Sequence, residues 1–598
     1  MRARIAEAAE GNPLFIEQMV AMLGSDEAED GEIAVPPTIE ALLAARLDLL
    51  PPDERRLVEA AAIAGREFSL DGVVALLAGG DEEALDPSLE RLHRKQFLSP
   101  AGERLYRFRH QLICDAAYEA IPKLARSALH VHYADWLEQE TPAPAVELEE
   151  IAGYHLERAF LLAREVDPLS ESLQEVGQRA AGCLRDAGER AHARGDMPAA
   201  VSLLKRAQAL PARSESERAQ LLLALAGAQR EVGDFEAAND ASAQAIALAS
   251  SLGNRALESQ ARILRLRIQL QTQVSLALDE LVQSAEQTIG ELEDLGDEQG
   301  LGEAWSVLAW MSWLRCRAGA TAQSLERALV YAQGAGDEPT VAQSLNLRIG
   351  TWLFGPTPVA EAIARCEQVL ARPHTQRRIE ASANGALAGL QAMLGRFEEA
   401  RALLEQGHAI LDELGLRVAS AVAAEIGGMV ELLAGEPAAA EERLRAGIAL
   451  LEPMGETSGV STLTAILAEA CYQQGRPDEV LELSARSARL APDDDFSTQV
   501  QWRGPQAKVL AARGRFAEAE ALASEAVSLA AESDFLNLRG NALLALAEVL
   551  RVGGRLAEAR SAAEEARALF EQKGNIVSSA GAQKLLAELP LAWAGAPS

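Results

Sequence analysis

The residues best suited to hold a ligand are a group of tryptophans with arginines close by. Four of the seven tryptophans fall between positions 305 and 352, and they are Trp305, Trp310, Trp313 and Trp352. Arg315 and Arg317 follow Trp313 at short range. A tryptophan ring beside a guanidinium can stack on an aromatic ligand or clasp an anionic one. We predict ligand or partner binding at Trp313, Arg315 and Trp352, with the alternative that these rings fill a gap between helices. Trp305 and Trp310 are expected in the core.

Residue types that support catalysis or metal binding are present but are not arranged for either. The eight histidines and five cysteines show no spacing typical of a nucleophile with its base. His130 and His132 are two residues apart, so on a helix they point in different directions and do not share a metal. The sequence G-x-x-x-x-G-K-[ST] is absent, so no loop of that type can cradle nucleotide phosphates. We predict no catalytic residues, no metal site and no enzymatic activity for this chain by itself.

The composition describes an acidic protein rich in small and aliphatic residues. The 598 residues include 56 basic and 89 acidic side chains, which gives a net charge of −33. Hydrophobic residues make up 48 % and aromatic ones 4 %, which favours helices packed through alanine and leucine. The sequence shows no signal peptide and no apolar stretch near the ~18 residues of a membrane span. With widely spaced cysteines, these features predict a cytoplasmic protein without membrane association.

One turn motif recurs along most of the chain. Clear copies are Gly233-Asp-Phe-Glu-Ala-Ala238, Gly395-Arg-Phe-Glu-Glu-Ala400, Gly514-Arg-Phe-Ala-Glu-Ala519 and Gly554-Arg-Leu-Ala-Glu-Ala559, and weaker copies begin at Gly195, Gly319, Gly355, Gly435 and Gly475. From Gly319 onward the interval is 36 to 40 residues. Each unit therefore predicts a helix, a glycine turn, a second helix and a glycine cap, because glycine adopts the left-handed backbone that ends helices. About ten units, one of them degenerate near Thr272 to Leu276, form a predicted α-solenoid over residues 141–590.

The repeat frame also places Trp313 in an exposed column. At the matching position, six residues before the turn glycine, the other units carry Gly389, Met429, Glu469, Lys508 and Glu548. The helix pairs resemble the tetratricopeptide repeat in their G-x-[F]-x-x-A turn, from about residue 147 to residue 589. Their period of about 40 residues is longer than the usual ~34. The resemblance implies a superhelix whose concave face holds a peptide, a partner helix or a small effector.

The first 140 residues follow a different pattern. Asn12-Pro13, Pro36-Pro-Thr38 and Pro51-Pro-Asp53 each start a predicted helix, and two more helices are expected over residues 69–77 and 82–95. Short strands at residues 97–99 and 105–108 would form a hairpin. Three helices and a hairpin are typical of a winged helix. We predict an all-α protein with a helical segment over 1–50, a winged-helix domain over 51–140, the solenoid over 141–590 and a tail over 591–598.

Three stretches carry a second resemblance. GNPLFIEQM (11–19), PPTIEALLAARLDLLPPDERRLVEAAAIAGREF (36–68) and YRFRHQLICDAAYEAI (106–121) resemble the region downstream of the nucleotide-binding core in STAND-type signalling ATPases. Relatives of that kind include MalT-like regulators and cyclase-associated ATPase and repeat proteins. The resemblance implies that residues 1–50 are an ATPase lid, that Pro13 packs on adenine and that His110 touches the ADP phosphate. The alternatives are a helix-opening proline and a structural histidine.

The same resemblance implies that no cofactor is held by this chain. ATP or ADP would bind only through a core upstream of it, and the chain would be the C-terminal part of a longer ATPase. The predicted function is a regulatory and sensor region that binds a protein partner, a peptide or a small effector on the solenoid. One alternative is a stand-alone scaffold. Another is a DNA-binding regulator that uses the basic residues of the winged helix (Arg91, His93, Arg94, Lys95, Arg104, Arg107 and Arg109), which the net charge of −33 disfavours.

Overall fold

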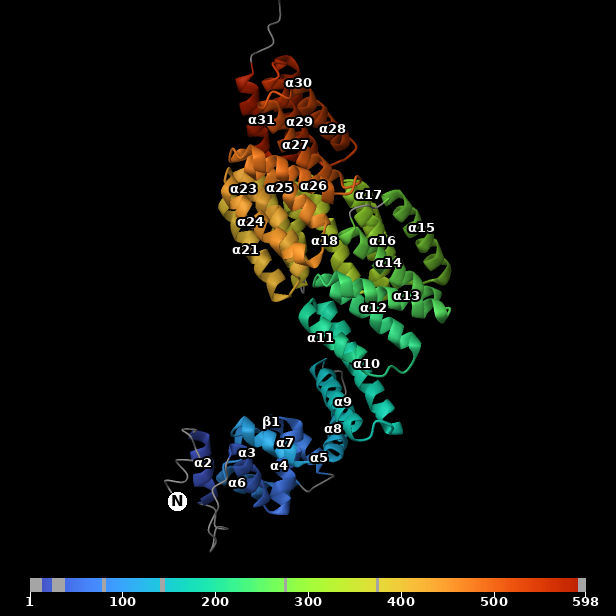
Figure 1. Cartoon of the computed structure of the whole chain (residues 1–598), viewed down its shortest axis with the longest axis vertical. Coiled ribbons are helices and arrows are strands. Elements are labelled where there is room, and N and C mark those ends of the chain that lie inside the picture. The colour runs from blue at the N-terminus through green and yellow to red at the C-terminus, as the bar shows by residue number, and fades with distance from the viewer. Residues whose placement is uncertain are drawn as a thin grey trace, which may run out of the picture. The chain divides into compact units, whose positions relative to one another are not determined.

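The computed structural model describes residues 13–23, 38–77, 82–139, 146–273, 277–372 and 376–589. The chain divides into two compact units, which are treated separately below. Unit 1 comprises residues 1–187 and 203–213, and unit 2 comprises residues 188–202 and 214–598. Both are built mainly of helices (Figure 1). The predicted tail, residues 591–598, lies outside the described residues.

Unit 1 combines helices with one small sheet. Strand β3 (Leu105–Phe108) pairs antiparallel with both β1 (Glu67–Ser69) and β2 (Leu98–Gly102). The helices are α2 (Pro13–Leu23), α3 (Ile39–Asp48), α4 (Pro52–Ala64), α5 (Leu70–Leu76), α6 (Glu82–Arg94), α7 (Gln111–Ala120), α8 (Lys123–Gln139), α9 (Val146–Val166) and the first part of α10 (Glu171–Arg194). The hairpin β2–β3 was predicted, whereas β1 was missed because three residues are too short to show a period.

The helix starts in unit 1 follow the local signals in the sequence. Thr38 caps α3, since its side-chain oxygen accepts a hydrogen bond from the backbone of Ala41 at 3.1 Å. Proline opens α4 at Pro52, where a missing N–H does no harm. The sheet is fixed by Phe68 and Phe108, which are buried with ring centroids 5.9 Å apart. These contacts explain why short elements hold a defined arrangement.

Unit 2 is a row of helix pairs. Its helices after α10 are α11 (Met197–Gln208, shared with unit 1), α12 (Glu215–Glu231), α13 (Phe235–Ser251), α14 (Arg255–Thr272), α15 (Leu278–Leu295), α16 (Glu298–Leu314), α17 (Ala318–Ala335), α18 (Glu338–Phe354), α19 (Val359–Leu370), α20 (Arg377–Met393), α21 (Phe397–Glu413), α22 (Arg417–Val422), α23 (Ala424–Ala434), α24 (Pro437–Leu451), α25 (Ser458–Gln473), α26 (Pro477–Leu490), α27 (Phe496–Ala512), α28 (Phe516–Ala531), α29 (Leu536–Val552), α30 (Leu556–Lys573) and α31 (Ile576–Glu588). In the second half, successive first helices begin at 377, 417, 458, 496, 536 and 576, which is a spacing of 38 to 41 residues. The degenerate unit expected near residue 272 is present as the pair α14 and α15, although residues 274–276 of its turn lie outside the described residues.

Most turns use glycine with a left-handed backbone, as at Gly395 with φ of 77°. The expected turn at Gly319 is wrong by three residues. Cys316 has the left-handed backbone there, with φ of 53°, and Gly319 already belongs to α17. The reason is a distant side chain, because the carboxylate of Asp534 accepts hydrogen bonds from the backbone of Ala318 at 2.7 Å and of Gly319 at 2.9 Å. That contact fixes the start of α17 and is invisible in the local sequence.

Small residues set the distance between paired helices. The alanines five residues after the turn glycines are completely buried, and they are Ala400, Ala440, Ala519 and Ala559. Gly540 has the same role in α29, because a Cβ atom placed there would lie 2.6 Å from the ring of Phe570. A larger side chain at these positions would force the helices apart. The low aromatic content therefore follows from close helix packing.

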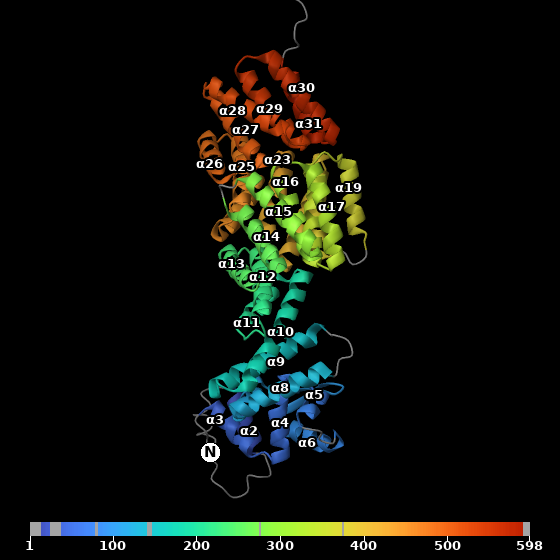
Figure 2. The same cartoon turned by 90° about the vertical axis from the view of Figure 1, so that its right-hand side faces the viewer.

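Within unit 2, helices far apart in the sequence lie side by side. Helices α14 and α25 are in direct contact, and Figure 2 shows them close together. The backbone N–H of Thr457 donates to the carbonyl of Gln271 at 2.9 Å, and the guanidinium of Arg315 contacts Asp494 at 2.8 Å. The array is therefore wound so tightly that later repeats pack on earlier ones, and part of its inner face is enclosed.

Candidate functional site

The inner face of unit 2 contains a cavity of about 280 Å³. Its wall comes mainly from the first helices of successive pairs, namely α14, α16, α18, α20, α22, α23, α25 and α27. Gly350 on α18 and Gly385 on α20 line the cavity without side chains and so leave room, and Leu353 and Ile426 add aliphatic surface. The cavity exists because the winding brings helices from several repeats to one place.

Aromatic side chains form one wall of this cavity. The ring of Trp313 meets Phe354 edge-on at a centroid distance of 5.8 Å and Phe535 at 5.1 Å. Trp310 lines the same wall, and its indole N–H is buried without an acceptor among the described residues. Trp313 was predicted to be exposed, but it is half-buried because the enclosed inner face covers it. Trp310 and Trp305 are also only partly buried.

The other two predicted ligand residues do not line the cavity. Arg315 is bound by two carboxylates, Asp494 at 2.8 Å and Asp279 at 2.7 Å. Trp352 on α18 is partly buried and packs against the core formed by α18, α19 and α20, with the guanidinium of Arg365 5.8 Å from its ring centroid. The structure thus brings only Trp313 of the three predicted residues to the cavity.

Three carboxyl groups that the sequence did not single out also line the cavity: Glu425, Glu456 and Asp495. Glu456 and Asp495 are each 4 % exposed. An oxygen of Glu456 accepts from the backbone of Gly459 at 2.8 Å, and one of Asp495 accepts from Thr498 at 3.2 Å, so both help to start a helix. The capping spacing was readable in the sequence, but their convergence was not.

The environment of these carboxyl groups opposes ionisation. Burial, with a smaller effect from the charge of Asp495, raises the pKa of Glu425 to about 7. Burial likewise raises the pKa of Glu456 to about 7, although the helix N–H groups oppose the shift. The pKa of Asp495 is raised to about 6, again by burial and against its hydrogen bonds to Thr498. Protonating these carboxyl groups, or placing a positive charge beside them, would relieve the free-energy cost of holding negative charge in this environment.

We expect the native protein to lose stability relative to Glu425→Gln as the pH rises. The folded protein keeps the Glu425 proton up to about pH 7, whereas the ordinary pKa is 4.5. The resulting stabilisation is fully present below pH 4.5 and is lost as the pH rises through about 7. Urea unfolding at pH 5 and pH 8 should show the native protein losing about 2 kcal/mol more than the variant. Equal losses in both proteins would show that Glu425 ionises normally.

A buried polar cluster lies beside the cavity within unit 2. Its centre is Glu231, which contacts Arg230, Arg378 at 3.1 Å and the amide of Gln343 at 3.0 Å. Burial would raise the pKa of Glu231, but the charges of Arg230 and Arg378 outweigh that effect and lower it to about 2. Arg378 also lines the cavity, so this one side chain joins the cluster to the site.

The residues that the STAND resemblance singled out lie in unit 1. Pro13 is the exposed first residue of α2. His110 precedes α7, and its Nε2 atom lies 3.5 Å from the carboxylate of Glu17 on α2. Helix α2, which begins at Pro13, therefore contacts His110, the residue before α7. Nothing in these contacts identifies a nucleotide.

The basic residues of unit 1 are largely engaged with acidic neighbours. Arg91 on α6 and Lys95, the residue after that helix, contact the buried carboxylate of Glu54 at 2.6 Å and 3.1 Å. Arg104 on the hairpin pairs with Asp71. Such pairing reduces the positive charge that a DNA phosphate would meet and so weakens the DNA-binding alternative.

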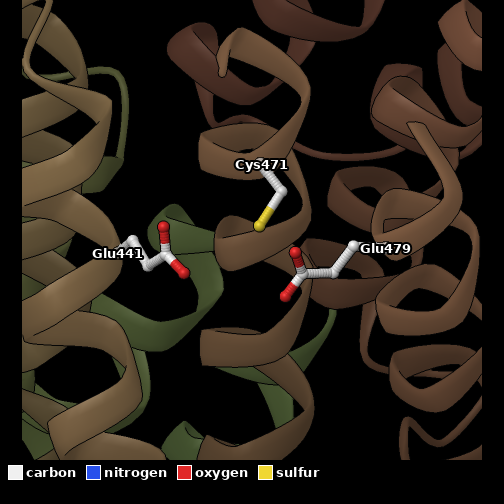
Figure 3. A group of neighbouring side chains, drawn as sticks. All are labelled: Glu441, Cys471 and Glu479. Carbon is white, nitrogen blue, oxygen red and sulfur yellow. The ribbon is translucent and has the colours of Figure 1, made fainter. Parts of the chain in front are cut away.

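One group within the described residues has the spacing of metal ligands: Glu441, Cys471 and Glu479 (Figure 3). Two arginines already pair with these side chains. Arg476 contacts all three side chains, and Arg445 contacts both carboxylates. Burial raises the pKa of the Cys471 thiol to about 11, so it stays protonated at neutral pH. The group is an ion-pair network and does not offer the open, deprotonated ligand set that a metal needs.

Comparisons with known proteins agree with the geometry of unit 2. The tetratricopeptide repeat family matches residues 381–406, 462–486, 503–525 and 540–565. The C-terminal region therefore contains tetratricopeptide repeats. Within the described part of the chain, no helix is long and apolar enough to cross a membrane. The architecture is an all-α solenoid of the tetratricopeptide type.

Individual relatives are distant. An uncharacterized protein of Rhizobium meliloti (strain 1021) is 29 % identical over 181 residues, which span 29 % of this chain and 18 % of that protein. A STAND protein with a tetratricopeptide repeat sensor from Pyrococcus horikoshii is 14 % identical with a TM-score of 0.35, covering 81 % of this chain and 69 % of its own. A Rap protein complexed with competence and sporulation factor is 12 % identical with a TM-score of 0.36, covering 62 % and 97 %. Yeast Tom70 is 11 % identical with a TM-score of 0.32, covering 77 % and 96 %.

Proposed function

We propose that this chain is the sensor and protein-interaction region of a STAND-type signalling ATPase, and that its effector or partner binds on the inner face of the repeats. The observation that carries the proposal is the cavity on that face, lined by helices from several repeats. Because several repeats contribute to the cavity wall, an occupant would favour one degree of winding over others. Such coupling is what a sensor requires.

Unit 1 supports the signalling part of the proposal. Unit 1 contains, in chain order, α4, β1, α5, α6, β2 and β3, and β3 is the central strand of the sheet. A winged helix would show the same order. In the proposed switch this module relays the state of the repeats to the nucleotide core, where Pro13 and His110 would meet the nucleotide. The chain itself would supply no catalysis. The coding DNA upstream of Met1 tests this part, since an in-frame Gly-Lys-[Ser/Thr] loop is expected there. A stop codon directly upstream would instead favour the stand-alone scaffold.

The cavity assignment can be tested by filling the cavity. Gly385 lines it from α20, and a Cβ atom there would make only an ordinary contact of 3.5 Å with Ile426. We expect Gly385→Trp to fold and to occupy the space meant for the effector. Fractionated cell extract should contain a species that raises the melting temperature of the native chain by several degrees, as ligand at about 100 times its Kd would. Gly385→Trp should not respond, and an equal response would place the binding site elsewhere.

A further inference from the structure

We propose that the cavity in unit 2 binds a small organic cation, an ammonium or guanidinium group carried on an apolar body. This inference rests on the proposed function, because it assigns the ligand class of the same inner-face site. It is carried by the convergence of three carboxyl groups and four aromatic rings on one cavity.

The first argument is the imbalance of charge in the cavity. Glu425, Glu456 and Asp495 line it, and the charge of Asp495 acts on both of the others. Among the lining residues the only basic side chain is Arg378, and that guanidinium is held 3.1 Å from Glu231. The cavity therefore gathers acidic groups without a cation of its own to neutralise them.

The second argument is that Glu425 has no partner. Within the described part of the chain it makes no hydrogen bond and no ion pair, whereas Glu456 and Asp495 each serve a helix start. The side chain is surrounded by protein yet still partly accessible, as expected when it faces an internal space. A carboxyl group that is largely surrounded by protein and has no partner is costly to ionise, and a ligand cation would supply the missing counter-charge.

The third argument concerns the body of the ligand. Trp310, Trp313, Phe354 and Phe535 offer ring surfaces that attract a cation and shelter an aliphatic or aromatic portion. The unpartnered indole N–H of Trp310 could donate to a carbonyl or hydroxyl oxygen of the same ligand. At about 280 Å³ the cavity is at the small end of ligand pockets. This size suits a free amine or one basic side chain of a peptide.

The test measures binding of defined probes to the full chain by calorimetry and by tryptophan fluorescence. The probes are phenethylamine and agmatine, with phenethyl alcohol as the uncharged match, and a short arginine-containing peptide with its citrulline counterpart. We expect the charged probes to bind at least tenfold more tightly than their uncharged matches. Tighter binding by the free amines indicates a small-molecule ligand, and tighter binding by the arginine peptide indicates a basic side chain.

Three variants separate the inference from the proposed function. Glu425→Gln should weaken the charged probes at least tenfold, while the exposed control Glu405→Gln should bind them normally. If no charged probe binds, or if Glu425→Gln binds them as the native chain does, the cation inference is overturned. If Gly385→Trp also leaves the response to cell extract unchanged, the inner-face site itself is wrong. If the charged probes fail to bind but Gly385→Trp loses the response to cell extract, the inner-face site is retained and only the ligand class is rejected.

Discussion

Replacing Glu231 by glutamine should lower the free energy of unfolding by about 3 to 5 kcal/mol, because it leaves buried guanidinium groups without their counter-charge. The Glu231 side chain is 5 % exposed and holds Arg230 and Arg378. Glutamine keeps the shape but cannot neutralise two cations. Urea unfolding followed by circular dichroism at pH 7 measures the effect.

Two comparisons sharpen this prediction. The exposed pair of Glu405 with Arg443, 2.9 Å apart, should contribute less than about 1 kcal/mol, so Glu405→Gln serves as the control. The contribution of Glu231 should also depend on pH in a defined direction. Because its pKa is lowered from 4.5 to about 2, the stabilisation is complete above pH 4.5 and is lost as the pH falls toward 2. A loss in Glu231→Gln no larger than in Glu405→Gln would contradict the buried network.

Lys573→Met should be the second most damaging substitution, with a loss of about 3 kcal/mol, since three buried carbonyl oxygens would lose their donor. Lys573 is completely buried at the end of α30. Its ammonium donates to the carbonyl oxygens of Trp352 at 2.9 Å, Gly355 at 2.7 Å and Thr357 at 2.7 Å, where α18 ends. Methionine preserves the volume but not these bonds.

The same variant reports on the winding of the repeats. Lys573 joins α30 to α18, which are more than 200 residues apart in the chain. We expect hydrogen exchange to quicken at the end of α18 in Lys573→Met, in addition to the loss in urea stability. The exposed Lys584 provides the matched control, and Lys584→Met should change neither quantity. Unchanged exchange at α18 would mean that this contact does not hold the two parts together.

The contacts also suggest how a ligand bound in the cavity would affect the stability of other parts of unit 2. Arg378 belongs both to the cavity wall and to the buried cluster around Glu231. A ligand cation beside the carboxyl groups would repel this guanidinium and strengthen its pairing with Glu231. Binding and cluster stability are therefore expected to depend on each other.

The helices and their turns are determined by the sequence itself. A glycine such as Gly395 ends a helix because only glycine adopts the left-handed backbone without strain, and that preference is local. Ala400 and its counterparts are buried because small side chains are needed where paired helices cross. Thr38 and Pro52 start helices by equally local chemistry. These effects act over a few residues and can be read in one pass along the chain.

The site was decided by the tertiary structure. Glu425 and Asp495 are 70 residues apart in the sequence, and Trp313 and Phe535 are separated by a still longer stretch of chain. No local spacing therefore predicts that these residues share a cavity. The small rotation between neighbouring helix pairs accumulates along the array, and its total fixes which repeats meet. The same winding encloses Trp313, which the column pattern predicted as exposed, and moves the turn at Gly319 to Cys316 through a contact with Asp534. The sequence sets each helix pair, whereas the sum of their packing angles makes the cavity.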